Sequence, residues 1–160
     1  MTEREVVIRQ VEPMALLSVE HAGAYWQINR AFETLTHWLE QHRLLAAELR
    51  LIGIYYDDPS VVEERALRSR ACVLLPHPVQ MSVTVSPPVA VTHVDGGEYA
   101  VLLHQGPYSD LPATYEWLYR TWLPASGRQG AQAPSFEEYL NSPMDTAPAD
   151  LKTEIFLPLV

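Results

Sequence analysis

Carboxylates and aromatic rings alternate in two short segments near the end of the sequence. Glu137 and Tyr139 are separated by one residue, and so are Glu154 and Phe156. Successive side chains of a β-strand point to opposite faces, so the members of each pair share a face. A carboxylate beside aromatic rings suits an organic cation, which gains charge pairing and an attraction to ring faces of roughly 0.5 to 2 kcal/mol. We therefore expect a ligand site here, although a hydrophobic core would use the same aromatic residues, Trp122 above all.

The segment that contains Glu137 has a counterpart earlier in the chain. Ile52-Gly-Ile-Tyr-Tyr-Asp-Asp-Pro59 and Phe136-Glu-Glu-Tyr-Leu-Asn-Ser-Pro143 share Tyr and Pro at the same spacing. Tyr55 thus matches Tyr139, and Gly53 stands where the second copy has Glu137. If helices cover the aliphatic faces, Glu137 and Glu154 point to the opposite surface, near the junction of the two copies. Glu138, on the other face of its strand, is expected to be a structural or solvated charge.

The duplication extends over the chain. His21-Ala-Gly-Ala-Tyr25 matches His104-Gln-Gly-Pro-Tyr108 at a shift of 83 residues. The same shift relates two apolar stripes with the spacing of an amphipathic helix, which are Ile28, Phe32, Leu35 and Leu39, and Leu111, Tyr115, Leu118 and Trp122. Beyond the helices the shift is 84, which predicts one extra residue in the second helix-to-strand connection. We expect the second helix to end at Pro124.

Each copy reads strand, helix, strand, strand. The sequence therefore predicts an α+β fold made by tandem duplication of a β-α-β-β module, with antiparallel sheets, two main helices and a central cleft. Residues 1–160 would form a single domain of two half-repeats, about 1–80 and 85–160. Gly96-Gly97 is predicted to be the turn between the first two strands of the second copy.

Composition excludes several classes of protein. The net charge of −9, from 11 basic and 20 acidic residues, opposes direct nucleic-acid binding. No apolar run approaches the roughly 20 residues of a membrane span, and the N-terminal residues do not resemble a signal peptide. The single cysteine, Cys72, suits a reducing compartment and a buried apolar position, so we expect a cytoplasmic protein. The six histidines form no metal-binding motif, and we expect neither a metal nor a cofactor.

Several motifs, in order along the chain, resemble the GyrI-like family. They are Leu-Ile-Gly-Ile-Tyr-Tyr-Asp-Asp-Pro59, Gly-Gly-Glu-Tyr-Ala-Val101, Tyr115-Glu-Trp-Leu-Tyr-Arg-Thr-Trp-Leu-Pro124, Phe-Glu-Glu-Tyr-Leu-Asn141 and Thr-Glu-Ile-Phe-Leu-Pro158. That family includes SbmC-type DNA gyrase inhibitors and the effector-binding domains of AraC-type and MerR-type transcription regulators. The chain differs from those regulators because it shows no DNA-binding helices, which speaks against a role as a transcription factor.

The resemblance implies two SHS2-type modules around a shared cleft that binds amphipathic, often cationic or aromatic, small molecules. By motif position the ligand-binding residues would be Glu137, Glu154, Tyr55 and Tyr139, and Tyr108 and Trp26 would be further candidates after the repeated turns.

Three functions follow from the resemblance. The first is a stand-alone binding protein that sequesters toxic compounds or metabolites. The second is an SbmC-like protein that contacts DNA gyrase. The third is a hydrolase of cyclopropane-bearing compounds, in which Glu137 or Glu154 would act as acid or base and would need a raised pKa.

Overall fold

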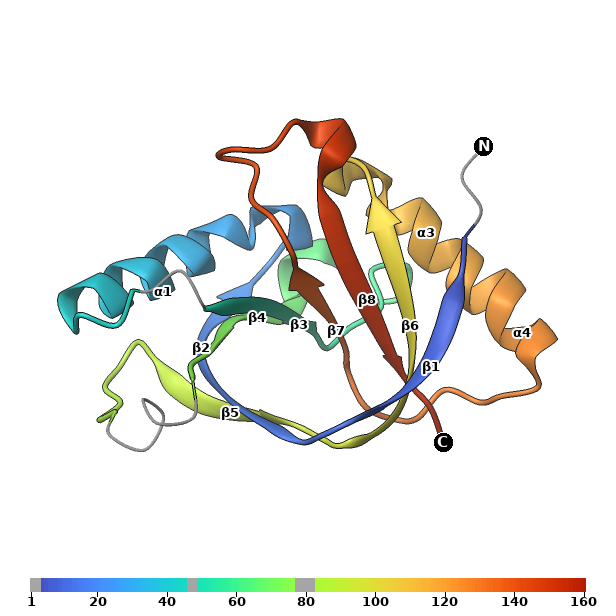
Figure 1. Ribbon diagram of the computed structural model, residues 1–160, viewed down its shortest axis with the longest axis horizontal. Helices are drawn as coiled ribbons and strands as arrows, with labels where there is room; N and C mark the ends of the chain where they lie inside the picture. The colour runs from blue at the N-terminus through green and yellow to red at the C-terminus, as the bar shows by residue number, and fades with distance from the viewer. Residues whose placement is uncertain (1–3, 46–48, 77–82) are drawn as a thin grey trace. The chain divides into compact units, whose positions relative to one another are not determined.

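The computed structural model describes residues 4–45, 49–76 and 83–160. The chain divides into two compact units. We call the first the C-terminal unit; it comprises Met1–Glu12 and Gly96–Val160. The second, Pro13–Asp95, is the N-terminal unit. Each unit contains antiparallel strands and helical segments (Figure 1), so the predicted α+β class with antiparallel sheets is confirmed.

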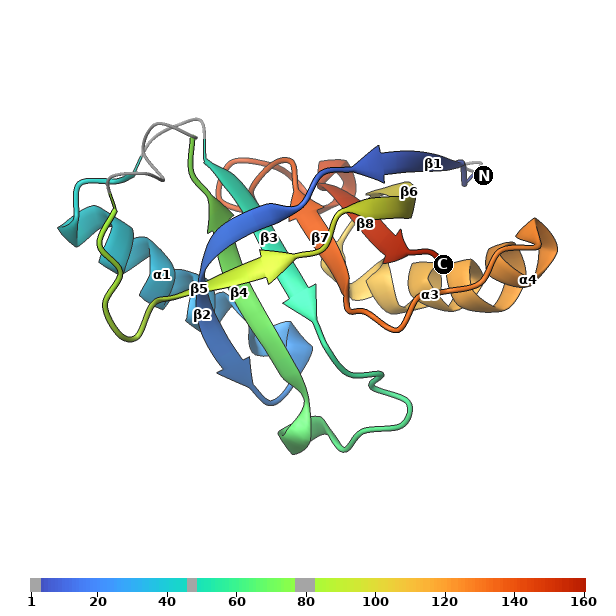
Figure 2. The same ribbon diagram turned by 90° about the horizontal axis from the view of Figure 1, so that it is seen from below.

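The C-terminal unit is a four-stranded antiparallel sheet with one long helical segment. The strand order is β1-β6-β8-β7, and the strands are β1 (Val6–Val11), β6 (Gly97–Gln105), β7 (Ser135–Tyr139) and β8 (Lys152–Pro158). The helical segment runs along this sheet (Figure 2) and consists of η3 (Tyr108–Asp110), α3 (Leu111–Trp117), the π-helical turn η4 (Leu118–Trp122) and α4 (Leu123–Ser126). Its buried residues Leu111 and Leu118 pack against Leu102, Ile155 and Leu157 of the sheet. One face of the sheet is therefore the helix face.

The N-terminal unit repeats this design. Its strand order is β3-β4-β2-β5, and the strands are β2 (Met14–Ala22), β3 (Arg50–Tyr55), β4 (Arg68–Leu74) and β5 (Ala90–Val94). Its helical segments are η1 (Tyr25–Gln27), α1 (Asn29–Gln41) and the short turn η2 (Glu64–Ala66). Leu35 and Leu39 of α1 are buried against the sheet, and Ile28 and Phe32 pack beside them. The predicted stripe of the first helix is confirmed.

The elements of the two units correspond at the shifts seen in the sequence. A shift of 83 takes β2 onto β6 and η1 onto η3, and a shift of 84 takes β4 onto β8 and η2 onto η5 (Pro148–Asp150). In the second stripe Leu111 and Leu118 are buried, and Tyr115 and Trp122 pack against the same core. The boundary of the half-repeats near residue 80 lies outside the described residues, and the central cleft stays a prediction.

The first strand of each half-repeat pairs with strands of the other half. β1 pairs with β6, and β5 pairs with β2, each antiparallel. The compact units therefore do not coincide with the half-repeats. Gly97, whose φ is 147°, begins β6, and the connection at Gly96-Gly97 joins two strands that have different partners instead of forming a hairpin turn.

The second helix was wrongly predicted to end at Pro124. The helical segment continues through α4 to Ser126, and Gly127 with φ 74° ends it in the left-handed conformation. Pro124 lies just after the π-helical turn and close to the end of the segment, and the helical conformation continues past it to Ser126. The connections that lead to β3 and β7 have equal length, so the extra residue was wrongly placed in the second connection and lies in the helical segment. A π-helical turn holds more residues than an α-helical turn, which accounts for this extra residue.

Candidate ligand-binding site

An aromatic cluster lies on the face of the C-terminal sheet opposite to the helix. Phe136 of β7 and Phe156 of β8 are directly opposed, and their rings are stacked with centroids 4.4 Å apart at 10°. Tyr99 of β6 meets these rings edge-on, at 5.3 Å from Phe136 and 6.3 Å from Phe156. Alternation along β8 separates Phe156 from Ile155 and Leu157 on the helix face. The cluster therefore provides a platform of buried rings.

A charged pair lies beside this platform. Glu154 is on the same face of β8 as Phe156, and its Oε2 accepts a hydrogen bond from Nη2 of Arg9 at 2.5 Å. The guanidinium carbon of Arg9 is 5.5 Å from the centroid of the Phe156 ring. The side chains are 47% exposed for Arg9 and 21% exposed for Glu154. The guanidinium of Arg9, itself an organic cation, therefore contacts a carboxylate and an aromatic ring. These are the two contacts that we expect a cationic ligand to make.

A second acidic group lies on the helix face. Glu137 is opposite Ile155 in the sheet and is only 4% exposed. Its carboxylate accepts hydrogen bonds from the hydroxyl of Tyr115 at 2.6 Å and from that of Tyr139 at 2.9 Å. The ring of Tyr108 is 5.8 Å from the ring of Tyr139. Burial, and next the charge of Glu137, raise the pKa of Tyr108, so this phenol is neutral at physiological pH.

The expectation that Glu137 and Glu154 share a surface is wrong. The register sets Glu137 opposite Ile155 and Glu138 opposite Glu154, so Glu138 is the acid that shares the face of Glu154. Glu138 is 8% exposed, which makes it buried and not solvated. The prediction failed because Phe136, the large apolar residue of β7, packs in the aromatic platform and not under the helix. The structure thus brings Glu137, Tyr139 and Tyr108 together and separates them from Glu154.

Tyr115 is a partner of Glu137 that the sequence analysis missed, although the duplication contains a signal for it. At the shifts of 83 and 84, Tyr115 matches Phe32 and Glu137 matches Gly53. One copy therefore has an apolar ring and no side chain where the other has a phenol and a carboxylate. The two differences belong together, because a buried carboxylate is costly unless it is hydrogen-bonded.

Tyr55 and Trp26 belong to the N-terminal unit. The ring of Tyr55 meets that of Tyr25 edge-on at 4.8 Å. The Tyr25 hydroxyl donates to the carbonyl oxygen of Asp57 at 2.8 Å and accepts from the N–H of Asp57 at 2.9 Å, so Tyr25 holds the chain that follows β3. Trp26 is 75% exposed in η1. The ligand-binding roles of Tyr55 and Trp26 stay predictions.

An Asp–Arg pair fixes the same end of the N-terminal unit. The carboxylate of Asp57 accepts hydrogen bonds from the backbone N–H of Arg68 at 2.8 Å and from its guanidinium at 3.0 and 3.1 Å. These bonds lower the pKa of Asp57. In the C-terminal unit Asn141 takes the matching place, and its Oδ1 accepts from the N–H of Lys152 at 2.8 Å. These residues have a structural role.

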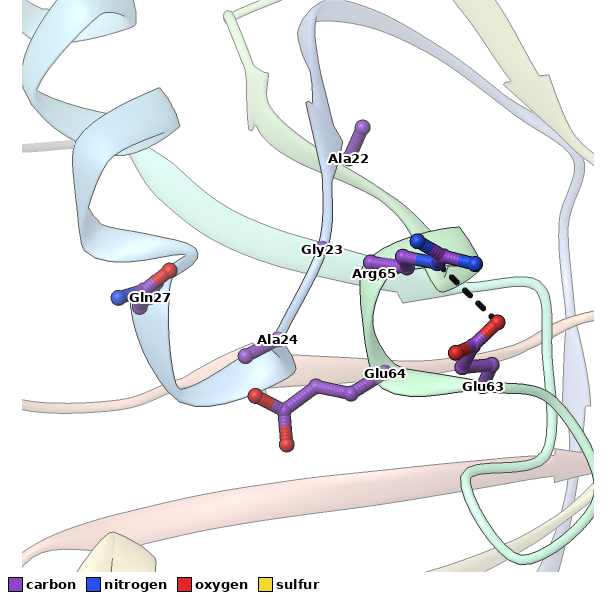
Figure 3. A pocket seen from close by; sticks show the side chains of 7 residues that line it. All are labelled: Ala22, Gly23, Ala24, Gln27, Glu63, Glu64 and Arg65. Carbon is purple, nitrogen blue, oxygen red and sulfur yellow. Dashed lines mark ion pairs between the residues drawn. The ribbon is translucent and has the colours of Figure 1, made fainter.

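The N-terminal unit also contains a buried thiol and a surface hollow. Burial raises the pKa of the Cys72 thiol to about 12, which agrees with the expected apolar role. A surface hollow of about 460 Å³ (Figure 3) is lined by Ala22, Gly23, Ala24, Gln27, Glu63, Glu64 and Arg65. Its lining contains no aromatic ring, and Arg65 is paired with Glu63 at 3.1 Å. Within residues 4–45, 49–76 and 83–160, no cluster of three or more His, Cys, Asp or Glu is placed to hold a metal ion.

Comparison with known proteins places the chain in a family. Residues 4–160 match the model of the GyrI-like small molecule binding domain. The DNA gyrase inhibitor of Salmonella typhimurium is 30% identical over 154 residues, which cover 95% of this chain and 96% of that protein. The crystal structure of the EcmrR C-terminal domain has a TM-score of 0.76 at 14% identity and covers 99% of both chains. The structure of SAV2435 bound to tetraphenylphosphonium has a TM-score of 0.61 at 15% identity, over 98% of this chain and 94% of that one.

These findings define a small-molecule-binding domain of the α+β class. The chain belongs to the GyrI-like family, as its motifs indicated.

Proposed function

We propose that the protein binds organic cations that carry aromatic groups, with Glu154 as the charge partner and the ring of Phe156, next to which Arg9 lies, as the ring contact. The observation that carries this proposal is the placement of Arg9. Its guanidinium, a planar organic cation, contacts the carboxylate of Glu154 and the ring of Phe156 at once. A ligand with a delocalised positive charge has the chemistry to make the same two contacts.

Two further observations support the proposal. The family is one of small-molecule-binding domains, and a protein of the same fold, SAV2435, is known bound to tetraphenylphosphonium, an aromatic cation. The net charge of −9 also attracts cations toward the protein at low ionic strength. Binding of this kind would serve to sequester toxic compounds or metabolites in the cytoplasm. In the described part of the chain, no helix has the length and apolar character needed to cross a membrane.

Calorimetric titration with tetraphenylphosphonium tests this function. Glu154→Gln keeps the size of the side chain and removes the charge, so we expect it to weaken binding severalfold, and the neutral compound triphenylphosphine oxide should bind less tightly than the cation to the unsubstituted protein. Absence of tetraphenylphosphonium binding, or binding that neither Glu154→Gln nor the charge of the ligand affects, would refute the proposal.

A second candidate function is inhibition of DNA gyrase by direct contact. It is favoured by the similarity to the DNA gyrase inhibitor of Salmonella typhimurium, which extends over nearly the full length of both proteins. Purified protein added to gyrase and relaxed plasmid would then reduce supercoiling in proportion to its concentration. Undiminished supercoiling at a large molar excess of the protein would exclude this function.

A further inference from the structure

We propose that Arg9 is an internal competitor: its guanidinium occupies the ligand site and lowers the affinity of that site for external cations. This inference rests on the proposed function, because it concerns the same carboxylate and ring. Arg9 makes both contacts assigned to the ligand, the charge-assisted hydrogen bond to Glu154 and the cation–π contact with Phe156. A cation that binds there must displace the guanidinium.

The position of Arg9 in the sheet allows it to reach the site and to leave it. Arg9 on β1 is opposite Tyr99 on β6, and Tyr99 is opposite Pro158 on β8, so the side chain crosses the middle strand to reach Phe156 and Glu154. Nearly half of the Arg9 side chain is exposed, so the guanidinium can turn into water and be hydrated. The position that matches Arg9 at the shift of 83 is Thr92 on β5, so the repeated scaffold does not require an arginine there.

The strength of this competition follows from the two contacts. An ion pair between partly exposed groups and a cation over a ring at an exposed site together favour the occupied state by about 3- to 30-fold, which is about 0.7 to 2 kcal/mol. The affinity of an external cation is reduced by the fraction of molecules in which the site is open. The contact therefore weakens ligand binding by about the same factor.

The competition also selects the class of ligand. A compact ammonium ion can replace Arg9 at the carboxylate, but it covers little of the ring surface that the planar guanidinium covers. A cation that carries an aromatic ring can replace the guanidinium both at the carboxylate and at the Phe156 ring. We therefore assign the site to delocalised, aromatic cations and not to simple alkylammonium ions.

Titration of tetraphenylphosphonium into substituted full-length proteins tests the competition. Arg9→Gln removes the cation and keeps part of the stem, and it should tighten binding by about 3- to 30-fold. Arg9→Thr, which copies the residue at position 92, should tighten binding in the same direction. Arg128→Gln is the matched control. Arg128 pairs with Glu98 at 2.9 Å in the same unit, on the helix face of the sheet, so its loss should change affinity by less than about twofold.

A double-mutant cycle separates this inference from the proposed function. In the presence of Arg9, Glu154→Gln weakens the binding of the ligand and also the competing contact of Arg9. The second change partly offsets the first, so the measured loss of affinity is reduced. In the Arg9→Gln background the same substitution should therefore weaken tetraphenylphosphonium binding by a larger factor. Equal effects of Glu154→Gln in both backgrounds, or Arg9 variants that bind no more tightly, overturn the role of Arg9 while the binding function stands. If none of these proteins binds the cation, the proposed function fails and the role of Arg9 fails with it.

Discussion

The hydrogen bond between Tyr115 and Glu137 yields the most specific prediction for stability. Tyr115→Phe removes a hydroxyl that donates to a carboxylate which is only 4% exposed. A hydrogen bond to a charged group contributes about 1.5 to 3 kcal/mol, and the Glu137 carboxylate keeps its hydrogen bond from Tyr139 when this one is lost. We therefore expect Tyr115→Phe to lower the free energy of unfolding by about 2 kcal/mol.

Urea unfolding measures this change, and the fluorescence of Trp117 and Trp122 reports on the same helical segment. In a Glu137→Ala background the same substitution should cost far less, which gives a coupling energy of about 1 to 2 kcal/mol. Tyr108→Phe is the control, because within the described residues the structure records a ring contact for Tyr108 and no hydrogen bond of its hydroxyl. A loss below about 0.5 kcal/mol for Tyr115→Phe, or the same loss in both backgrounds, would refute the reasoning.

Two further predictions concern titration and reactivity in the N-terminal unit. The hydrogen bonds from Arg68 hold the pKa of Asp57 below its ordinary value of 3.8, so the stability that the pair contributes is present above that pH and is lost as the pH falls through the lowered pKa. Asp57→Asn, which copies Asn141, should therefore be less stable than the original protein at pH 7, and the gap should close in acid; a gap that is constant with pH would contradict this account. The Cys72 thiol, with its pKa raised to about 12, should not react with Ellman's reagent at pH 8 until the protein unfolds, and rapid labelling of the folded protein would show that the thiol is accessible.

The repeat and the helices could be predicted because their signals are local. The spacing of Leu111 and Leu118 fixes the buried stripe of a helix, and constant shifts reveal two copies of one design. The face of the sheet on which Glu137 lies could not be predicted in the same way. Alternation shows which residues of one strand share a face, but only the pairing register shows which face meets the helix.

The contact of Arg9 with Glu154 cannot be predicted from local sequence patterns. The two residues are 145 positions apart, and they meet only because β1 pairs with β6 and β6 pairs with β8. Differences between the two copies were more informative than either copy alone. Phe32 against Tyr115, and Gly53 against Glu137, mark the place where the C-terminal unit has a buried acid together with its hydrogen-bond donor and the N-terminal unit has neither.

A crystal structure with tetraphenylphosphonium tests the central claim most directly. We expect the cation to lie against the Phe156 ring, within about 6 Å of its centroid, and beside the carboxylate of Glu154, with the guanidinium of Arg9 moved away from the ring. Binding elsewhere, for example in the hollow lined by Glu63 and Glu64, with Arg9 still paired to Glu154, would contradict it.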